Sequence, residues 1–397
     1  MGLSPISAVP LYLRDLVEII WSDLFGDIYR DKEIFESKLS NLVGVEYVST
    51  FQSGSLAFYN LFEHLKSKGN EIRKEVILPA YTCPSLCYAI RDAGLIPVFV
   101  DIDNTFYPSV KDICAAKSAN TLAVLVVHHF GNTSFDLSDL KVKMKVKEKC
   151  PYIIEDICQT LGDMKDRING NLSDYYVLSF GHGKMMTTLN GGAVLSRSHT
   201  FSEWAIRGCK SIGRWKIKFI FKFVFIYLAQ KDFFYFLVHK YRTLKRRKDK
   251  YDLGSYKIPI LNDLELNPYQ FALGAKMALR LDDFNKIRRR NSNIYRKCFK
   301  DTNSLVLPDQ NSFFWRYVII FERESDKLLF KRKLMKQGIY ASTGNYPVAD
   351  EIPEMSEFVA SDKYRVAKSI SSTVLMLPTH PLVNPNKLMN VLKKNKI

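Results

Sequence analysis

The sequence has no long uncharged apolar run. Its most apolar stretch, residues 215–238, is interrupted by four lysines and Asp232, and its longest run free of charge is Phe223–Gln230. A membrane-spanning helix needs about 18 or more consecutive apolar residues, so we do not expect the chain to cross a bilayer. The first eight residues also lack a cationic start followed by an apolar core, so we expect no secretory signal and a cytoplasmic protein.

Cysteine pairs of the zinc-binding kind are missing too. The seven cysteines are irregularly spaced and include no two CxxC pairs, so we expect small buried residues in a reducing compartment. The adjacent His128 and His129 follow an apolar run, but neighbours on a strand point to opposite faces. We therefore expect no metal site, with one histidine lining a crevice and the other packed beneath it.

Acidic residues are few, since 41 Asp and Glu stand against 58 Lys and Arg, a net charge of +17. The segment Ile206–Lys250 holds 14 of these cations and 2 Asp, so it carries +12 of the surplus. Such a surplus indicates an anionic partner. Nucleic acid is not expected, because no base-reading module surrounds the segment.

Two interpretations of this basic, aromatic segment stay open. It can form a buried helical pair or a subunit interface. Alternatively, residues 215–250 make a peripheral contact with the inner face of a membrane, with aromatic rings among the lipid headgroups and Lys245-Arg246-Arg247-Lys248 on anionic lipid.

Short apolar runs alternate with helical patterns through the first half of the chain. This alternation is typical of an α/β fold with a mostly parallel sheet covered by helices on both faces. The run Leu122–Val127 contains nothing polar, so we expect it near the sheet centre. The seven predicted strands are Glu46–Thr50, Val76–Leu78, Val98–Val100, Leu122–Val127, Tyr152–Ile154, Tyr175–Ser179 and Gly192–Leu195, with helices at Ser55–Ser67 and Pro84–Ala93.

The pattern changes in the last third of the chain. Pro268–Phe299 predicts one long helix, and it is followed by a predicted strand at Trp315–Phe321, a helix at Lys327–Gln337 and an apolar tail ending in Leu375–Pro378. We therefore predict a large domain over residues 1–284, with the basic aromatic insert at about 210–250, and a smaller α+β domain over residues 285–397.

Three motifs at predicted strand ends carry the chemistry, because open α/β sheets bind ligands at the carboxyl ends of their strands. The first is Gln52-Ser53-Gly54-Ser55, where a strand passes into a helix. A small-residue turn at a helix N-terminus offers free N–H groups and hydroxyls to a phosphate. The alternative is an ordinary N-cap serine.

The second motif is the acidic pair Glu155-Asp156, which ends an apolar strand. We expect one carboxylate to point toward the sheet and the other toward the crevice. A buried carboxylate is costly unless a cation meets it, and a protonated ring nitrogen is such a cation. The alternative is a pair of solvated strand-end acids.

The third motif is Ser179-Phe180-Gly181-His182-Gly183-Lys184. A lysine held beside a cation or in an apolar pocket has a lowered pKa and can form a Schiff base. The alternative is a solvated loop lysine, which the close apolar strands disfavour. A phosphate-binding P-loop is excluded, because Leu178 stands at its first glycine and Met185 at its Ser or Thr.

In this order and spacing, the motifs resemble the DegT/DnrJ/EryC/StrS sugar aminotransferases, which are pyridoxal-phosphate (PLP) enzymes of fold type I. The resemblance runs from the residue 30s to Pro381. It rests on Ser53-Gly54-Ser55, Leu78-Pro79-Ala80-Tyr81-Thr82, Pro97–Asp103, His128–Gly131, Glu155-Asp156 with Gln159, Ser179-Phe180 with Lys184, Gly191-Gly192 and Leu377-Pro378-Thr379-His380-Pro381.

The resemblance implies roles for the matched residues. Lys184 is the catalytic residue that holds the cofactor, and Asp156 pairs with its pyridinium nitrogen. Gly54, Ser55 and Ser179 bind its phosphate, and Gln159 contacts its ring oxygen or phosphate. The resemblance also implies a homodimer.

Two positions depart from the family pattern. Cys83 stands where an aromatic residue usually stacks on the cofactor ring, so Tyr81 or another group takes that place, or none does. The segment from Asn262 to Glu265 lacks the arginine of the family's Asn-x-Arg motif, which contributes to the partner subunit's site.

By this resemblance, the enzyme moves an amino group, from a donor such as glutamate, to a keto group of a nucleotide-activated sugar, in surface polysaccharide or amino-sugar biosynthesis. Family members that dehydrate sugars carry His in place of the Schiff-base lysine, and Lys184 argues against that activity here. A membrane-associated scaffold or regulator that has kept the fold without catalysis is the alternative.

Overall fold

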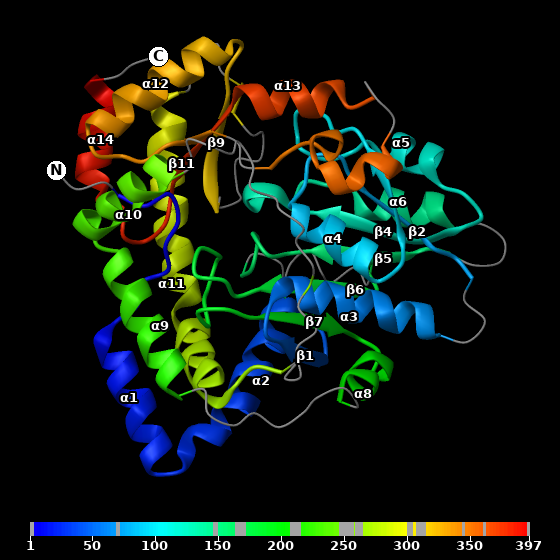
Figure 1. Ribbon diagram of the computed structural model, residues 1–397, viewed down its shortest axis with the longest axis horizontal. Coiled ribbons are helices and arrows are strands. Elements are labelled where there is room, and N and C mark those ends of the chain that lie inside the picture. Colours follow the sequence, from blue (N-terminus) through cyan, green and yellow to red (C-terminus); the bar gives the residue numbers. More distant parts are fainter. Residues whose placement is uncertain are drawn as a thin grey trace.

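The fold is built on two β-sheets joined by one long helix (Figure 1). The computed structural model describes residues 4–68, 72–145, 150–162, 172–206, 216–245, 258, 265–299, 305–306, 315–343, 346–359 and 363–394. Everything below concerns these residues.

The larger sheet has seven strands in the order β1-β7-β6-β5-β4-β2-β3. Strand β7 runs antiparallel to β1 and β6, and the other neighbours are parallel. All seven predicted strands are confirmed, and the fully buried β4 lies beside the middle strand β5. The strands are β1 (Tyr47–Phe51), β2 (Glu75–Pro79), β3 (Ile96–Val100), β4 (Thr121–Val127), β5 (Tyr152–Asp156), β6 (Tyr175–Ser179) and β7 (Gly192–Ser196).

Strand β4 divides its side chains between two hydrophobic cores. Leu125 and Val127 belong to the core that includes apolar residues of helices α3 (Gly54–Ser67) and α4 (Pro84–Asp92). Val124 and Val126 belong to a second core with α5 (Val110–Ala116) and α6 (Leu137–Met144). A strand buried on both faces needs apolar residues at every position, which is why its sequence is a continuous apolar run.

Helix α11 (Pro268–Cys298) is the predicted long helix, one residue shorter at its C-terminus. It begins with a capping box: the Asn267 side chain accepts from the Gln270 N–H at 3.0 Å, and the Gln270 side chain accepts from the Asn267 N–H at 3.1 Å. Its Gly274 lets the ring of Phe35 on α2 (Asp31–Val43) approach closely. The helix passes residue 284 without a break, and the division into two domains stays a prediction.

The second sheet has the strand order β10-β11-β9-β8 and is antiparallel throughout. Its strands are β8 (Leu305–Val306), β9 (Arg316–Ile320), β10 (Ser342–Thr343) and β11 (Val374–Pro378). The helices of this region are α12 (Glu324–Lys336), α13 (Arg365–Thr373) and α14 (Pro385–Lys394), with 3-10 turns at Ala349–Glu351 and Pro353–Phe358. The predicted strand, helix and apolar tail are confirmed here.

The basic insert forms two helices, α9 (Lys216–Ala229) and α10 (Asp232–Lys245), which run along one side of the molecule beside α1 (Leu13–Leu24) (Figure 1). Phe219, Phe223 and Ile226 of α9 are buried. No helix among the described residues combines the length and the apolar character that crossing a bilayer would require. The predicted lipid contacts of Trp215 and of residues 246–250 lie outside the described residues.

Candidate active site

The predicted site residues follow strands whose carboxyl ends meet at one edge of the larger sheet. Strand β1 is antiparallel to β7, as is β6, so β1 has the same direction as β2, β4, β5 and β6. Their following loops carry Ser53–Ser55, Tyr81, His128, Asp156 and Lys184. The topology therefore brings together residues that are more than 130 positions apart in the chain.

The turn before α3 offers hydroxyl groups at a helix N-terminus. The Ser53 side chain is the N-cap and accepts from the Leu56 N–H at 3.1 Å, so the N-cap interpretation is correct for this residue. The hydroxyls of Ser55 and Ser179 have no hydrogen-bond partner among the described residues. A Cβ on Gly54 would lie 2.8 Å from Ser179 Cβ, so glycine lets these two loops touch. The arrangement suits a phosphate.

The two acids of β5 are both buried, so the solvated interpretation is wrong. Glu155 points to His128, with its Oε2 2.7 Å from His128 Nε2, while His128 Nδ1 lies 2.8 Å from the Tyr107 hydroxyl. Asp156 Oδ1 accepts from the Cys158 N–H at 2.9 Å, and no Lys, Arg or His pairs with the carboxylate among the described residues. A buried carboxylate with no cationic partner suits a protonated ring nitrogen.

Lys184 is partly buried and lies over the indole ring of Trp315, with its Nζ 5.4 Å from the ring centroid. Neighbouring elements fix its loop, since Trp315 Nε1 donates to the Gly183 carbonyl at 2.6 Å and Arg288 Nη2 to the Met185 carbonyl at 2.9 Å. No acid pairs with Lys184 within the described part of the chain.

Lys184 and Asp156 come from neighbouring strands of the larger sheet. Asp156 ends β5, and β6, which pairs with β5 in parallel, leads into the loop of Lys184. Burial and the Asp156 carboxylate raise the pKa of the Cys158 thiol, while the Lys184 ammonium opposes that rise. That this lysine and this carboxylate act on one cofactor stays a prediction.

Gln159 and Tyr81 are more deeply buried than Lys184. Gln159 Oε1 accepts from the Phe130 N–H at 2.7 Å, and its Nε2 donates to the Tyr346 hydroxyl at 3.3 Å. The fully buried Tyr81 ring contacts the rings of Phe106, His129 and Tyr346, with centroids 5.6–5.7 Å apart. The roles predicted for Gln159 and Tyr81 toward a cofactor stay predictions.

His129 of the predicted histidine pair is buried, and burial lowers its pKa to about 3, so its ring is neutral at pH 7. Three residues of this neighbourhood were missed from the sequence: Trp315, Arg316 and Tyr346. Trp315 and Arg316 come from the start of β9 in the second sheet, and Tyr346 follows β10. No local motif marks them, because they reach the site only through packing between the two sheets.

These residues fit pyridoxal phosphate. Among the described residues, the hydroxyls of Ser55 and Ser179 have no hydrogen-bond partner, the buried Asp156 carboxylate has no cationic partner, and the Lys184 amine forms no ion pair. Each of these unmet groups matches one part of the cofactor: its phosphate, its ring nitrogen and its aldehyde.

Comparison with known proteins points to the same family of pyridoxal-phosphate enzymes. The model of the DegT/DnrJ/EryC1/StrS aminotransferase family matches residues 12–395. The chain belongs to this family. Its fold class, its enzyme class and its cofactor, predicted as fold type I, aminotransferase and PLP, are thereby confirmed. Family membership also disfavours the scaffold alternative.

The relatives cover nearly the whole chain. A GDP-perosamine synthase of Escherichia coli O157:H7 is 25% identical over 96% of this chain and 92% of its own length. A dTDP-4-amino-4,6-dideoxy-D-glucose transaminase of Shigella dysenteriae is 27% identical over 92% and 89%. Among solved structures, the PLP form of Spr1654 from Streptococcus pneumoniae covers 99% of this chain and 98% of its own, with a TM-score of 0.74 and 17% identity.

The structure describes part of the segment that lacks the arginine of the Asn-x-Arg motif. Asn262 to Leu264 are outside the described residues. The next residue, Glu265, forms an ion pair with Lys32 of α2, and its carbonyl accepts a hydrogen bond from the Gln52 side chain beside the phosphate turn. Leu264 stands at the arginine position of the Asn-x-Arg motif, and the acid that follows it is tied to α2 and to the turn that leads into α3.

Proposed function

We propose that the protein transfers an amino group from glutamate to a keto group of a nucleotide-activated sugar, as part of surface polysaccharide or amino-sugar synthesis. The donor C–N bond becomes a C=O bond, and the sugar C=O becomes a C–N bond, so nothing is oxidised or reduced overall. The observation that carries the proposal is the pairing of the neighbouring parallel strands β5 and β6, of which one ends in the Asp156 carboxylate, without a cationic partner among the described residues, and the other leads into the loop of Lys184.

The residues divide the work by position. Asp156 holds a proton on the ring nitrogen, and Ser55, Ser179 and the N–H groups beside Gly54 hold the phosphate. The Lys184 amine would hold the cofactor and would carry a proton to and from the reacting carbon of the substrate. When bound, the cofactor supplies an aldehyde that takes up the amino group and a ring that withdraws electrons from the reacting carbon.

The choice of acceptor rests on the relatives, whose names describe enzymes of GDP-linked and dTDP-linked sugars. A basic protein of net charge +17 suits a substrate that carries a diphosphate. Glutamate as donor is proposed on the resemblance to the family. The sugar and the aminated carbon are not assigned.

The first test is the variant Lys184→Ala. Wild-type protein supplied with PLP should show the absorbance band of a lysine-bound cofactor, and glutamate with the correct keto-sugar nucleotide should give 2-oxoglutarate and an amino sugar. Lys184→Ala should lose both the band and at least about 10³-fold of the activity, since its amine is used directly. A purified wild-type protein that takes up no PLP would reject the proposal.

We also propose a homodimer, as the resemblance implies. The chain mass is 45.8 kDa, so light scattering should give twice this value for the PLP-loaded protein. A monomer that is fully active would contradict this part of the proposal.

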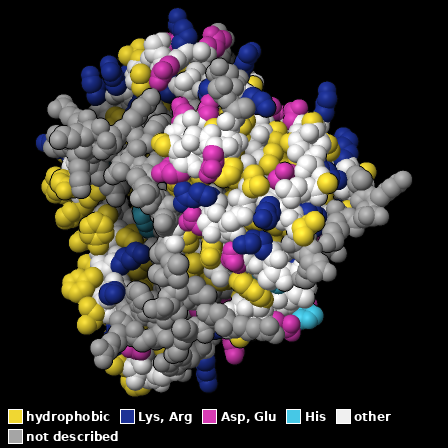
Figure 2. All heavy atoms as spheres, turned by 45° about the vertical axis from the view of Figure 1, so that its right-hand side comes forward, with side chains coloured by type: hydrophobic (Ala, Val, Ile, Leu, Met, Phe, Trp, Pro, Cys, Tyr) yellow, Lys and Arg dark blue, Asp and Glu magenta, His cyan; other side chains and the backbone are white. Residues whose placement is uncertain are grey.

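The finer proposal concerns a membrane contact through α1, α9 and α10, which we call the apolar face. Each helix exposes apolar side chains at spacings of three or four residues, which places them in one stripe per helix. Figure 2 shows hydrophobic side chains gathered along the edge where these helices lie in Figure 1. The stripes are Leu13, Val17, Trp21 and Leu24 on α1, Ile217, Phe221, Phe225 and Leu228 on α9, and Phe233, Leu237 and Tyr241 on α10.

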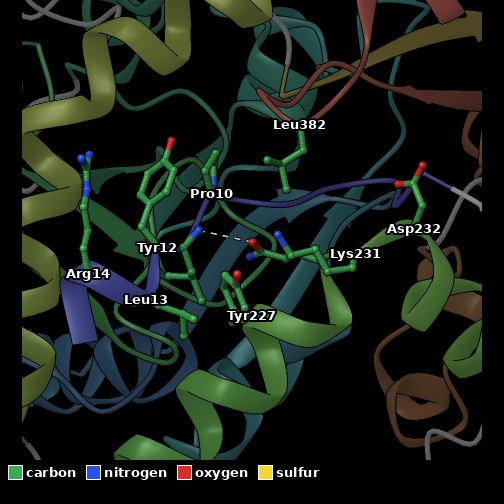
Figure 3. Close-up of a pocket in the computed structure, with 10 residues that line it drawn as sticks. Pro10, Tyr12, Leu13, Arg14, Tyr227, Lys231, Asp232 and Leu382 are labelled. Carbon is green, nitrogen blue, oxygen red and sulfur yellow. Dashed lines mark hydrogen bonds between the residues drawn. The ribbon is translucent and has the colours of Figure 1, made fainter. Parts of the chain in front are cut away.

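The charges beside the apolar face favour an anionic membrane over a second copy of the chain. Helix α9 contains three lysines and no acid, so two copies meeting face to face would bring like charges together. A pocket of about 540 Å³ opens between α1 and the α9–α10 turn, with Arg14 and Tyr12 on one side and Lys231 across from them (Figure 3). Lys231 lies 4.7 Å from the Tyr227 ring centroid. Cations beside aromatic rings suit lipid headgroups.

A further inference from the structure

Arg316 is a cation placed inside the protein at the start of β9. Its Cζ stacks 3.9 Å from the ring centroid of its neighbour Trp315. Its Nη2 donates to the Ser7 hydroxyl at 3.3 Å, and its Nη1 lies 3.6 Å from the Met376 sulfur. Its Nε is shielded from solvent and has no hydrogen-bond partner among the described residues. The guanidinium therefore leaves most of its five donor hydrogens without a good acceptor.

No carboxylate neutralises this guanidinium within the described part of the chain. The ionisable groups that act on it are the phenols of Tyr346, Tyr235, Tyr340 and Tyr81, and burial lowers the pKa of Arg316. A buried cation without a counter-ion is costly. The residue is nevertheless partly accessible, so an anion from outside can reach it.

Two contacts place Arg316 beside the Schiff-base lysine. Arg316 Cζ and Lys184 Nζ both lie over the Trp315 ring, at 3.9 and 5.4 Å from its centroid. Ser7, which accepts a hydrogen bond from Arg316, also touches Gly183, since a Cβ on that glycine would lie 2.8 Å from the serine Oγ. The distance between Arg316 Cζ and Lys184 Nζ therefore cannot exceed the sum of these two distances.

The Asp156 side of the site connects to Arg316 as well. The Tyr346 hydroxyl accepts the hydrogen bond from the Gln159 side chain. Burial is the main cause that raises the pKa of Tyr346; the Arg316 cation lowers this pKa, and the Asp156 carboxylate raises it further. Arg316 thus shares the Trp315 ring with Lys184, and it comes from the start of β9 in the second sheet.

We propose that Arg316 binds a carboxylate of the amino donor, with both nitrogens of its planar fork. This proposal rests on the proposed function. In an amino acid, the nitrogen that replaces Lys184 Nζ is separated from its carboxylate carbons by only a few bonds. The diphosphate of a nucleotide sugar hangs on the anomeric carbon, and part of the sugar ring separates it from the carbon that receives the amino group. A carboxylate joined through few bonds to the reacting amine fits the short distance between Arg316 and Lys184 better than a diphosphate does.

The two half-reactions test this assignment separately. Glutamate converts the PLP-loaded enzyme to its amine-bearing form, which the loss of the absorbance band reports, and the keto-sugar nucleotide restores the band. Arg316→Met should lower kcat/KM of the glutamate half-reaction about 10²-fold, and Arg316→Lys should recover part of the loss. The sugar half-reaction should change less than about 3-fold. Arg323→Met, which removes an exposed arginine of the same region, should leave both unchanged.

A binding measurement gives a readout besides turnover. Glutarate carries the two carboxylates of glutamate without its amine, so its binding to the PLP-loaded protein, measured by calorimetry, should weaken about 10-fold or more in Arg316→Met. A simple alkylamine offered as donor should react equally with wild type and Arg316→Met, because it carries no carboxylate.

The outcomes are distinct. Equal glutamate and glutarate values for wild type and Arg316→Met would overturn the proposal, as would a loss confined to the sugar half-reaction, which would assign Arg316 to the diphosphate. A retained absorbance band shows that the variant has folded. If wild type itself neither binds PLP nor reacts with glutamate, the proposed function fails, and the role of Arg316 fails with it.

Discussion

Glu36 on α2 shows how burial sets the ionisation of a single side chain. Burial raises its pKa from 4.5 to about 7; Lys32 lowers it, and Glu265 and Glu33 raise it further. Because the folded state holds the proton more tightly than the unfolded state, this group contributes stability that is fully present below pH 4.5. That contribution is lost as the pH rises through about 7.

Glu36→Gln should remove this loss. Between pH 5 and 8, the free energy of unfolding of wild type should fall relative to the variant by about 1–2 kcal/mol, which is less than the full shift because the side chain is partly exposed. Urea unfolding at several pH values measures the difference, with Glu322→Gln, an exposed acid that does not act on Glu36, as control. Parallel curves for wild type and Glu36→Gln would contradict the burial argument.

At the residue scale, the sequence predicts those site residues that sit in local motifs. Asp156 ends a strand, and Gly54 and Lys184 lie in the short turns that follow strands, so the strand ends fix where they lie. Trp315 and Arg316 contact the same site from a strand some 130 residues downstream of Lys184. Their positions depend on how the two sheets pack together, which no local pattern encodes.

At the scale of elements, the junction of β7 and α3 has no room for a side chain. A Cβ on Gly192 would lie 2.6 Å from Gly54 Cα and 2.7 Å from its nitrogen. Backbone atoms cannot move aside as flexible side chains can, so the strand and the phosphate turn would have to separate.

Gly192→Ala should therefore destabilise the protein by about 2–3 kcal/mol and weaken PLP binding. Gly181→Ala is the matched control, because its Cβ would meet only Lys184 Cγ at 3.9 Å and Ser179 Oγ at 4.0 Å, which are ordinary contacts. Thermal unfolding and PLP titration measure both effects. If the two alanine variants behave alike, the close approach at Gly192 does not matter.

Strands were easier to predict than the N-terminal helices. The seven strands of the larger sheet are short apolar runs, and burial on both faces makes that pattern unambiguous. Helices α1 and α2 were not predicted. Helix α1 begins after Tyr12 without a side-chain N-cap hydrogen bond, so the usual signal for a helix start is missing from its sequence.

At the scale of the whole molecule, the uneven charge and the apolar face belong to the same side. The segment Ile206–Lys250 carries most of the net charge, and its described helices carry two of the three exposed apolar stripes. Of the two interpretations left open by the sequence, the buried one holds for part of α9, and the membrane contact stays a proposal. One side of α9 is packed inside, and the other is exposed.

Vesicle flotation tests the membrane proposal. Wild type should float with vesicles rich in phosphatidylglycerol, less so at high salt, and not with pure phosphatidylcholine. The double variant Phe221→Ser and Phe225→Ser should lose at least about 10-fold in binding, because each phenyl ring contributes roughly 1.5–3 kcal/mol when buried. Val142→Ser, an exposed apolar residue on α6, should bind as wild type does. Salt-independent binding to neutral vesicles, no binding at all, or self-association through this face would overturn it.

Helix α11 links the two regions more tightly than the predicted boundary at residue 284 suggests. Near its start, Gln270 donates to the Asn190 carbonyl beyond the lysine loop; further along, Asn291 and Tyr295 donate to the carbonyls of Thr379 and Pro378. A straight helix of 31 residues is roughly 46 Å long. A tilt of this helix by a few degrees would displace its far end by ångströms. The second sheet, with Arg316 and Trp315, therefore cannot move away from Lys184 unless α11 bends or loses its hydrogen bonds to one of the two regions.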